Sequence, residues 1–233
     1  MGIPSRTRIV SLFLKSIVIV SAAVGIFLSA RSARNTFMGG SRVLMFFTIQ
    51  SNIAIALISL FGAVLLFRRP PGGAWPVIKL AGTVSITLTG TVFTFMLAPV
   101  LGTRAWSVSN TLTHVVVPAT AIIDFLVIGA YFDIPKKNVF WVLLPPAAYV
   151  VYAAIGYVNG WEFMDGVNYP YFFLNWGSPL GAFGFSNEWP FMGCVWWILV
   201  LLAFLLAVGR IDLLITGRIR NKRLASQQTD HQA

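Results

Sequence analysis

The sequence IVSLFLKSIVIVSAAVGIFLSA, residues 9–30, indicates that this chain enters a membrane. Its 22 residues include a single charged side chain. About 20 apolar residues cross the hydrocarbon core of a bilayer as an α-helix, so this run is long enough to span it. Arg6 and Arg8 precede the run as basic residues precede the core of a signal peptide, but Leu28 and Ala30 do not form a good small-residue cleavage pattern. We therefore expect a first transmembrane helix that is retained.

The rest of the chain has a similar composition. Of its 233 residues 57% are hydrophobic and only 10% are charged, which is more apolar than a water-soluble core of this size can bury. After the first run, we expect five further spans at about 43–67, 77–99, 109–131, 139–159 and 190–209. The sequence thus predicts an all-α polytopic integral membrane protein, with a six-transmembrane-helix bundle as a single domain over residues 1–225. We expect the polar residues 226–233 to form a disordered cytoplasmic tail.

The net charge of +10 predicts membrane topology and not a nucleic-acid partner, because the basic residues lie at the ends of apolar runs. On the side of the N-terminus we place Arg6, Arg8, Lys15, Arg68, Arg69, Lys79, Lys136, Lys137, Arg210, Arg218, Arg220, Lys222 and Arg223. The opposite side receives Arg31, Arg34, Arg42 and Arg104. Because positive charge accumulates on the inner side, we expect both termini in the cytoplasm.

The one long loop, at about 160–189, is unusually aromatic. Glu162, Asp165 and Glu188 make it acidic, and it would face outward. Its aromatic residues are Trp161, Phe163, Tyr169, Tyr171, Phe172, Phe173, Trp176, Phe183, Phe185 and Trp189. A solvated linker has fewer such side chains, so we expect this extracytoplasmic loop between the fifth and sixth helices to lie in the membrane interface or to fold back as a lid.

Thr48 and His114 are the strongest candidates for chemistry inside the membrane. The second and fourth spans run in the same direction, and each of these residues lies about five positions in, or about 8 Å along a helix. They therefore share a depth in the outer leaflet. A hydroxyl beside an imidazole is the minimum unit of nucleophilic catalysis, because neutral histidine can take the hydroxyl proton during attack. The alternatives are a structural histidine and a threonine bonded to its own backbone.

Further polar residues surround this pair in the sequence. Asn52 follows Thr48 by one helical turn and Asn110 precedes His114 by one, so the four can cluster and the amides can serve as oxyanion donors. Candidates for additional substrate or oxyanion contacts are Gln50, Ser51, Tyr169 and Tyr171. In the third span, small hydroxyl residues including Thr83, Ser85, Thr87 and Thr89 favour helix packing over a polar conduit.

The remaining reactive side chains predict structural roles. Asp124 lies ten residues beyond His114, about 15 Å deeper, which is too far to orient the imidazole. We expect it to pair with a basic residue such as Lys79 or Arg68. Cys194 is the only cysteine and lies among apolar residues, so we expect it to pack. We expect no metal or cofactor, because the sequence contains no zinc-protease motif, membrane histidine pair or nucleotide fingerprint.

Three motifs carry a resemblance to a known family: FFTIQSN (46–52), SNTLTHVVVP (109–118) and NYPYFFLN (168–175). With these motifs the chain resembles a bacterial six-span family distantly similar to the eukaryotic androgen-induced membrane hydrolases, which include the androgen-dependent TFPI-regulating protein. The resemblance implies an intramembrane threonine hydrolase of the bacterial inner membrane that cleaves fatty-acid esters of hydroxy fatty acids. Its nucleophile and base correspond to Thr48 and His114.

We interpret the sequence as that of an intramembrane lipid-ester hydrolase. Its substrate would be a membrane lipid or fatty-acid ester, attacked by Thr48 with His114 as general base. The alternatives are a non-catalytic lipid-binding or transport protein, in which the same polar cluster holds a headgroup, and a structural membrane subunit. Only the first of these requires an activated hydroxyl.

Overall fold

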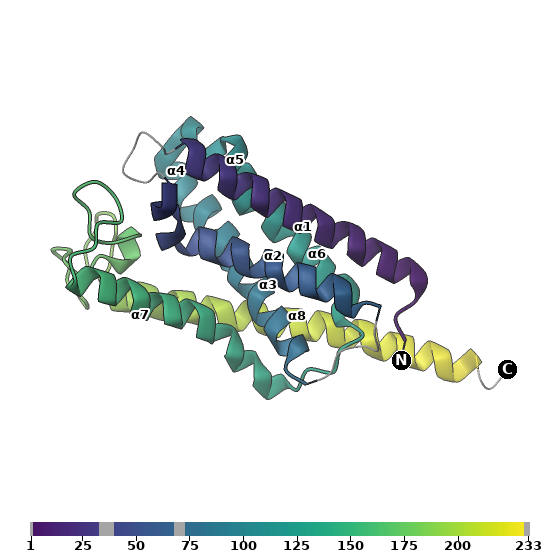
Figure 1. The fold of residues 1–233 in the computed structure, drawn as a ribbon. Helices are drawn as coiled ribbons and strands as arrows, with labels where there is room; N and C mark the ends of the chain where they lie inside the picture. The colour runs from purple at the N-terminus through teal and green to yellow at the C-terminus, as the bar shows by residue number, and fades with distance from the viewer. Residues whose placement is uncertain (1, 33–39, 68–72, 231–233) are drawn as a thin grey trace.

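The computed structural model describes residues 2–32, 40–67 and 73–230. Six helical segments in these ranges are long and apolar enough to cross a membrane (Figure 1). They are Ser5–Ser32, Phe47–Leu65, Trp75–Leu101, Val108–Gly129, Lys136–Val158 and Cys194–Gln228. The six predicted spans are confirmed, with most boundaries within a few residues.

Three of the spans are continuous helices and three are composite. The continuous ones are α1 (Ser5–Ser32), α2 (Phe47–Leu65) and α8 (Cys194–Asp230). The third span joins α3 (Trp75–Val92), the π-helical η2 (Phe93–Leu97) and α4 (Ala98–Leu101). The fourth joins α5 (Val108–Thr111), the π-helical η4 (Leu112–Val116) and α6 (Val117–Gly129). The fifth joins the 3-10 helix η5 (Lys136–Leu143) to α7 (Leu144–Val158). Short 3-10 helices η1 (Gly40–Met45), η3 (Gly102–Trp106) and η6 (Phe172–Leu174) lie between the spans.

The sixth span differs most from its prediction. Its helix begins at Cys194 and continues to Asp230, about twenty residues past the predicted end at 209. Residues 226–230, predicted to be disordered, are helical, because nothing in the polar sequence after the apolar run breaks the helix. Residues 231–233 lie outside the described part, as do Arg34, Arg68 and Arg69.

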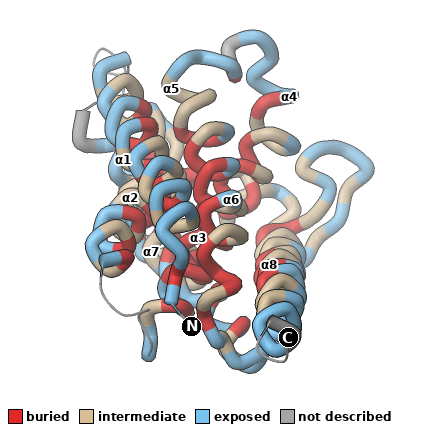
Figure 2. The backbone as a smooth tube through the Cα atoms, turned by 90° about the vertical axis from the view of Figure 1, so that its right-hand side faces the viewer, coloured by how far each residue is buried: buried red, intermediate tan, exposed pale blue. Residues whose placement is uncertain are grey.

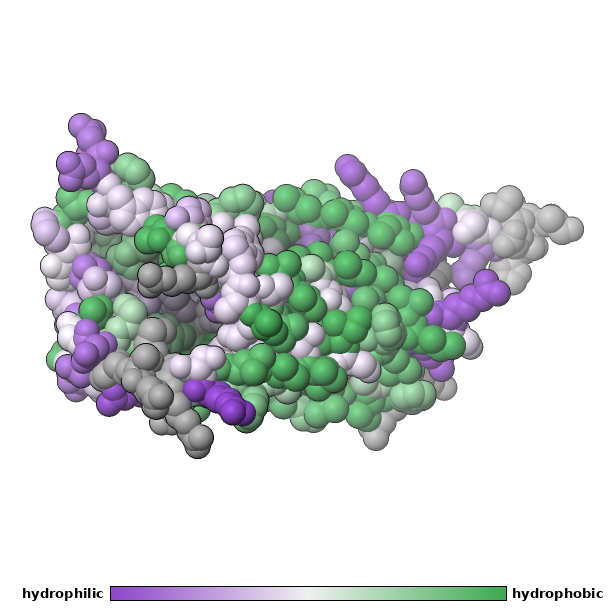
Figure 3. All heavy atoms as spheres, turned by 90° about the horizontal axis from the view of Figure 1, so that it is seen from above, coloured by the Kyte–Doolittle hydropathy of each residue, from purple (hydrophilic) through white to green (hydrophobic). Residues whose placement is uncertain are grey.

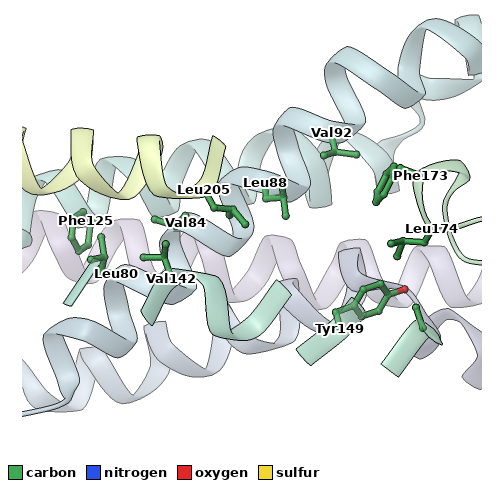
Figure 4. Close-up of a cluster of buried hydrophobic side chains, with 11 residues drawn as sticks. Leu80, Val84, Leu88, Val92, Phe125, Val142, Tyr149, Phe173, Leu174 and Leu205 are labelled. Atoms are coloured by element: carbon green, nitrogen blue, oxygen red, sulfur yellow. The ribbon is translucent and has the colours of Figure 1, made fainter. Parts of the chain in front are cut away.

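Helix α3 lies at the centre of the bundle. Thirteen of its 18 residues are buried, and Figure 2 shows it as a nearly continuous buried segment. Helices α2 and α6 pack on one side of it, with α1 packed against both of them, and α7 and α8 pack on the other. The largest apolar cluster extends from Leu80 and Phe125 at one end to Phe173 and Leu174 at the other (Figure 4). Exposed apolar side chains cover the outside as a broad hydrophobic band between more polar ends, as a bilayer requires (Figure 3).

Each π-helical segment lies around the residue four positions before a proline. Pro118 follows His114 by four, and Pro99 follows Phe95 by four. Proline has no N–H to donate to the carbonyl four residues earlier, so the regular α-helical bonding is interrupted there. Single π-turns of this kind often occur at functional sites. His114 is therefore in the irregular part of its span.

Both chain ends lie at the same end of the bundle, and the segment between α7 and α8 lies at the other (Figure 1). An even number of spans requires this arrangement. The assignment of this end to the cytoplasm is a prediction from the positions of the basic residues.

Candidate active site

One cavity of about 60 Å³ brings the predicted pair together. Thr48 at the start of α2 and His114 in η4 both line it. Its other polar groups come from Thr89, Tyr149 and Tyr171, and the rest of its wall is apolar side chains of α2, α3, η2, α7, α8 and the loop. The shared depth expected from the sequence is therefore matched by a shared cavity.

Thr48 lies in the first turn of α2, so the helix has no preceding turn whose carbonyl groups could accept a hydrogen bond from its hydroxyl. Its backbone N–H donates to the phenol oxygen of Tyr171 at 3.3 Å, and its Oγ1 lies 3.5 Å from the same oxygen. Within the described residues no hydrogen bond from Oγ1 to a backbone carbonyl is recorded. The usual structural role of a membrane threonine, bonding its own helix, is therefore not the one seen here.

The imidazole of His114 is only 8% exposed and has a defined orientation. Its Nδ1 lies 3.4 Å from the carbonyl oxygen of Thr89, which can only accept a hydrogen bond. Nδ1 therefore carries the proton, and Nε2 keeps its lone pair as a proton acceptor. This is the tautomer that a general base needs.

A chain of small polar side chains links the helices behind this pair. The Asn52 amide donates to the carbonyl of Thr48 at 2.8 Å and to that of Thr113 at 3.2 Å, while its own oxygen is buried and has no hydrogen-bond partner among the described residues. The hydroxyl of Ser51 lies 2.7 Å from that of Thr89. Asn52 thus connects the backbone at Thr48 to the residue before His114, so it positions the two segments. Its N–H groups are engaged and not free to act as oxyanion donors.

Three predicted site residues lie elsewhere. Asn110 donates to the carbonyl of Ala105, and its backbone N–H is capped by Ser107, so it stabilises the start of the fourth span. Gln50 donates to the carbonyl of Leu44 and faces a different groove. Tyr169 does not line the cavity.

The loop after α7 folds back over the cavity. Tyr171 stacks on Phe173 with 5.1 Å between ring centroids, and both line the cavity wall. Phe46, the residue before α2, contacts the edges of Tyr171 and of the fully buried Phe163. These aromatic contacts hold the loop against the start of α2. The part of the loop around residues 171–174 is therefore folded back against the cavity.

Residues missed by the sequence reasoning complete the site. Thr89 was attributed to helix packing, but its carbonyl orients His114 and its hydroxyl contacts Ser51. Tyr149 points its hydroxyl at the carbonyl of Met45 at 3.0 Å and lines the cavity. The sequence did contain a signal for Thr89, because it is a polar residue on the third span at about the depth of His114.

A second buried polar cluster lies deeper in the bundle. Asp124 accepts hydrogen bonds from Lys79 at 2.5 Å, from Lys15 at 2.7 Å and from Ser11 at 2.5 Å. The expected pairing of Asp124 with Lys79 is confirmed. Lys15, expected only as a topology signal, is 1% exposed and is the second counter-ion. The cluster joins α1, α3 and α6.

The described residues define a polytopic membrane protein with six apolar spans and a polar pair in a largely apolar cavity. Comparisons of the chain with protein-family models, with curated proteins and with solved structures gave no match.

Proposed function

We propose that this protein is an intramembrane lipid-ester hydrolase with Thr48 as nucleophile and His114 as general base. The observation that carries the proposal is that the Thr48 hydroxyl, unbonded to its own helix, and His114, with Nε2 as acceptor, line one apolar cavity. The resemblance of the motifs around both residues to the six-span threonine hydrolases supports the same roles.

In the proposed reaction, Thr48 Oγ1 attacks the ester carbonyl as His114 Nε2 takes its proton. The tetrahedral intermediate collapses, the alcohol leaves with the proton returned by His114, and an acyl-threonine remains. Water, activated by the same imidazole, then releases the fatty acid. No hydrogen bond between Thr48 and His114 is recorded in the described part, and such bonds often form only in the substrate complex.

Tyr171 is the best-placed oxyanion donor among the candidates. Its hydroxyl lies 3.5 Å from Thr48 Oγ1. Burial raises the pKa of the Tyr171 phenol, and its hydrogen bonds with Thr48 offset only part of that effect. The phenol therefore keeps its proton at neutral pH. Because it already accepts the N–H of Thr48, that proton is available for a developing oxyanion.

The cavity wall favours an ester with an apolar acyl chain. Leucine, valine and aromatic side chains surround the Thr48 and His114 pair, so a polar substrate would lose its hydration without compensation. The substrate we propose is a fatty-acid ester taken from the bilayer. We place the protein in the bacterial inner membrane with both termini in the cytoplasm, on the strength of the basic-residue asymmetry and the family resemblance.

Turnover by purified full-length protein tests this proposal. We expect hydrolysis of a long-chain fatty-acid ester in detergent, and its loss in Thr48→Val, which removes the hydroxyl and nearly keeps the shape. Thr87→Val is the matched control, because Thr87 bonds the carbonyl of Thr83 and does not line the cavity. No turnover of any ester in a panel, together with saturable lipid binding, would favour the non-catalytic lipid-binding alternative.

A further inference from the structure

A second hollow, of about 420 Å³, opens at the end of the bundle where both termini lie. Helix α8 forms one wall, and the segment between α6 and η5 forms the other. The α8 residues that line it are Arg210, Leu213, Leu214, Thr216, Gly217, Arg220 and Asn221. Each of them lies three or four positions from at least one other, so they lie along one side of the helix. We call this hollow the α8 groove.

The α8 groove is strongly basic. Arg210 and Arg220 contribute from α8 and Lys136 from the start of η5, against the single carboxylate of Asp133. Asp133 is already paired with Arg220. In the part of the chain that the structure describes, no ion pair is recorded for Arg210 or Lys136. Two cations of the groove thus have no counter-ion.

Arg220 is held in position at the groove wall by protein contacts. Its Nη1 donates to the carbonyl of Phe132 at 3.2 Å and to Asp133. Its Nε is buried, and among the described residues no hydrogen-bond partner is recorded for it. Guanidinium groups bind phosphate well, so Arg220, fixed through Nη1, adds a positioned guanidinium group to the wall of the groove.

The depth of the groove matches the headgroup layer of a membrane. Every charged residue of α8 lies at or beyond Arg210, after an uninterrupted uncharged run from Cys194 to Gly209. Figure 3 shows hydrophilic side chains gathered at this end of the molecule and a hydrophobic surface next to them. Leu213 and Leu214 line the groove between the two arginines, so cationic and apolar groups alternate along it.

We propose that the α8 groove binds the phosphate headgroup of an anionic phospholipid, with its glycerol and upper acyl chains against Leu213 and Leu214. Basic pockets between membrane helices bind such headgroups, and the unpaired cations supply the charge complementarity. The site is separate from the cavity of Thr48 and His114 and does not depend on the proposed hydrolysis.

The test is a lipid titration of full-length protein in a neutral detergent, with acyl-labelled dioleoyl phosphatidylglycerol and the zwitterionic dioleoyl phosphatidylcholine. We expect tighter binding of phosphatidylglycerol. In the double variant Arg210→Gln/Lys136→Gln its affinity should fall about fivefold for each charge removed. The control is Arg218→Gln/Lys137→Gln, which removes the same charge from residues outside the groove and should leave the affinity nearly unchanged.

Equal binding of the two lipids by the wild-type protein would overturn the proposal, whatever the variants do. An equal loss in the control variant would also overturn it, because the attraction would then come from the general surface charge. Binding of inorganic phosphate as tight as that of phosphatidylglycerol would overturn the assignment to a lipid. Failure of millimolar phosphate to displace the lipid is the expected result.

Discussion

The imidazole of His114 lies flat against the ring of Phe93, with 3.9 Å between ring centroids and 10° between their planes. The two residues come from the two π-helical segments, η4 and η2, each of which is followed by a proline. Stacking on one face and the contact of Nδ1 with the Thr89 carbonyl together fix the ring. The proposed base is therefore oriented by neutral groups of the neighbouring span, without a carboxylate.

Gly90 allows the close approach of helices that this arrangement needs. A Cβ at this position would lie 2.8 Å from the carbonyl oxygen of His114, so the backbone of one span must shift. We expect Gly90→Ala to lower hydrolysis at least tenfold and to destabilise the protein by about 1–3 kcal/mol. Thermal unfolding in detergent and ester turnover measure the two effects. Gly217→Ala is the control, since its Cβ would meet nothing within 4 Å. Wild-type activity in Gly90→Ala would show that the packing at His114 is not critical.

His114→Ala should abolish hydrolysis while the protein still inserts and folds. Losing one buried polar group costs only about 1–3 kcal/mol of stability, whereas the reaction loses its proton acceptor. The wild-type activity should also fall at acid pH, because a protonated imidazole cannot accept the hydroxyl proton. Purified variant and wild type are compared by gel filtration and by turnover across the pH range. A folded variant with full activity would remove His114 from the mechanism.

Tyr171→Phe should slow hydrolysis about 10²–10³-fold, the usual effect of removing an oxyanion donor. Burial raises the pKa of the Tyr171 phenol, so the proton it donates is retained at pH values where an exposed tyrosine begins to ionise. Ionisation of Tyr171 should therefore cause no decline of the wild-type rate at mildly alkaline pH, and the acid decline should be the same in both proteins. Tyr152→Phe is the control, because Tyr152 does not line the cavity. An equal loss in the control would mean that the slower hydrolysis of Tyr171→Phe does not come from the loss of an oxyanion donor in the cavity.

Asp124→Asn should be the most destabilising of these changes. It leaves the ammonium groups of Lys15 and Lys79 buried together without a counter-charge, at a cost of about 3–5 kcal/mol. Asp133→Asn is the matched control, because its carboxylate is 84% exposed and its ion pair with Arg220 contributes about 0–1 kcal/mol. Unfolding in mixed micelles compares them. Similar stability of the two variants would mean that the buried cluster does not hold α1, α3 and α6 together.

The sequence predicted the spans because membrane helices follow directly from hydropathy and length. It also predicted that Thr48 and His114 share a depth in the membrane, because the helical rise per residue converts a residue's place in its span into a distance along the helix axis. It could not predict which faces meet. Asn110 is one turn from His114, yet its side chain bonds the carbonyl of Ala105. The position of Lys15 in the sequence indicates only topology, whereas the packing of α1 against α6 brings its ammonium group to Asp124. Helix rotation depends on packing between spans, which no single run of residues specifies.

The most direct test of the account is covalent labelling of the nucleophile. Wild-type protein in detergent, treated with a fluorophosphonate and digested, should carry the adduct on the hydroxyl of Thr48, and Thr48→Val should carry none. Thr48→Ser should still be labelled, because it keeps the oxygen. An adduct on Ser51, whose hydroxyl lies 3.0 Å from the carbonyl of Thr48, would keep the hydrolase and move its nucleophile. Unlabelled wild-type protein that also fails to turn over any ester would contradict the central claim.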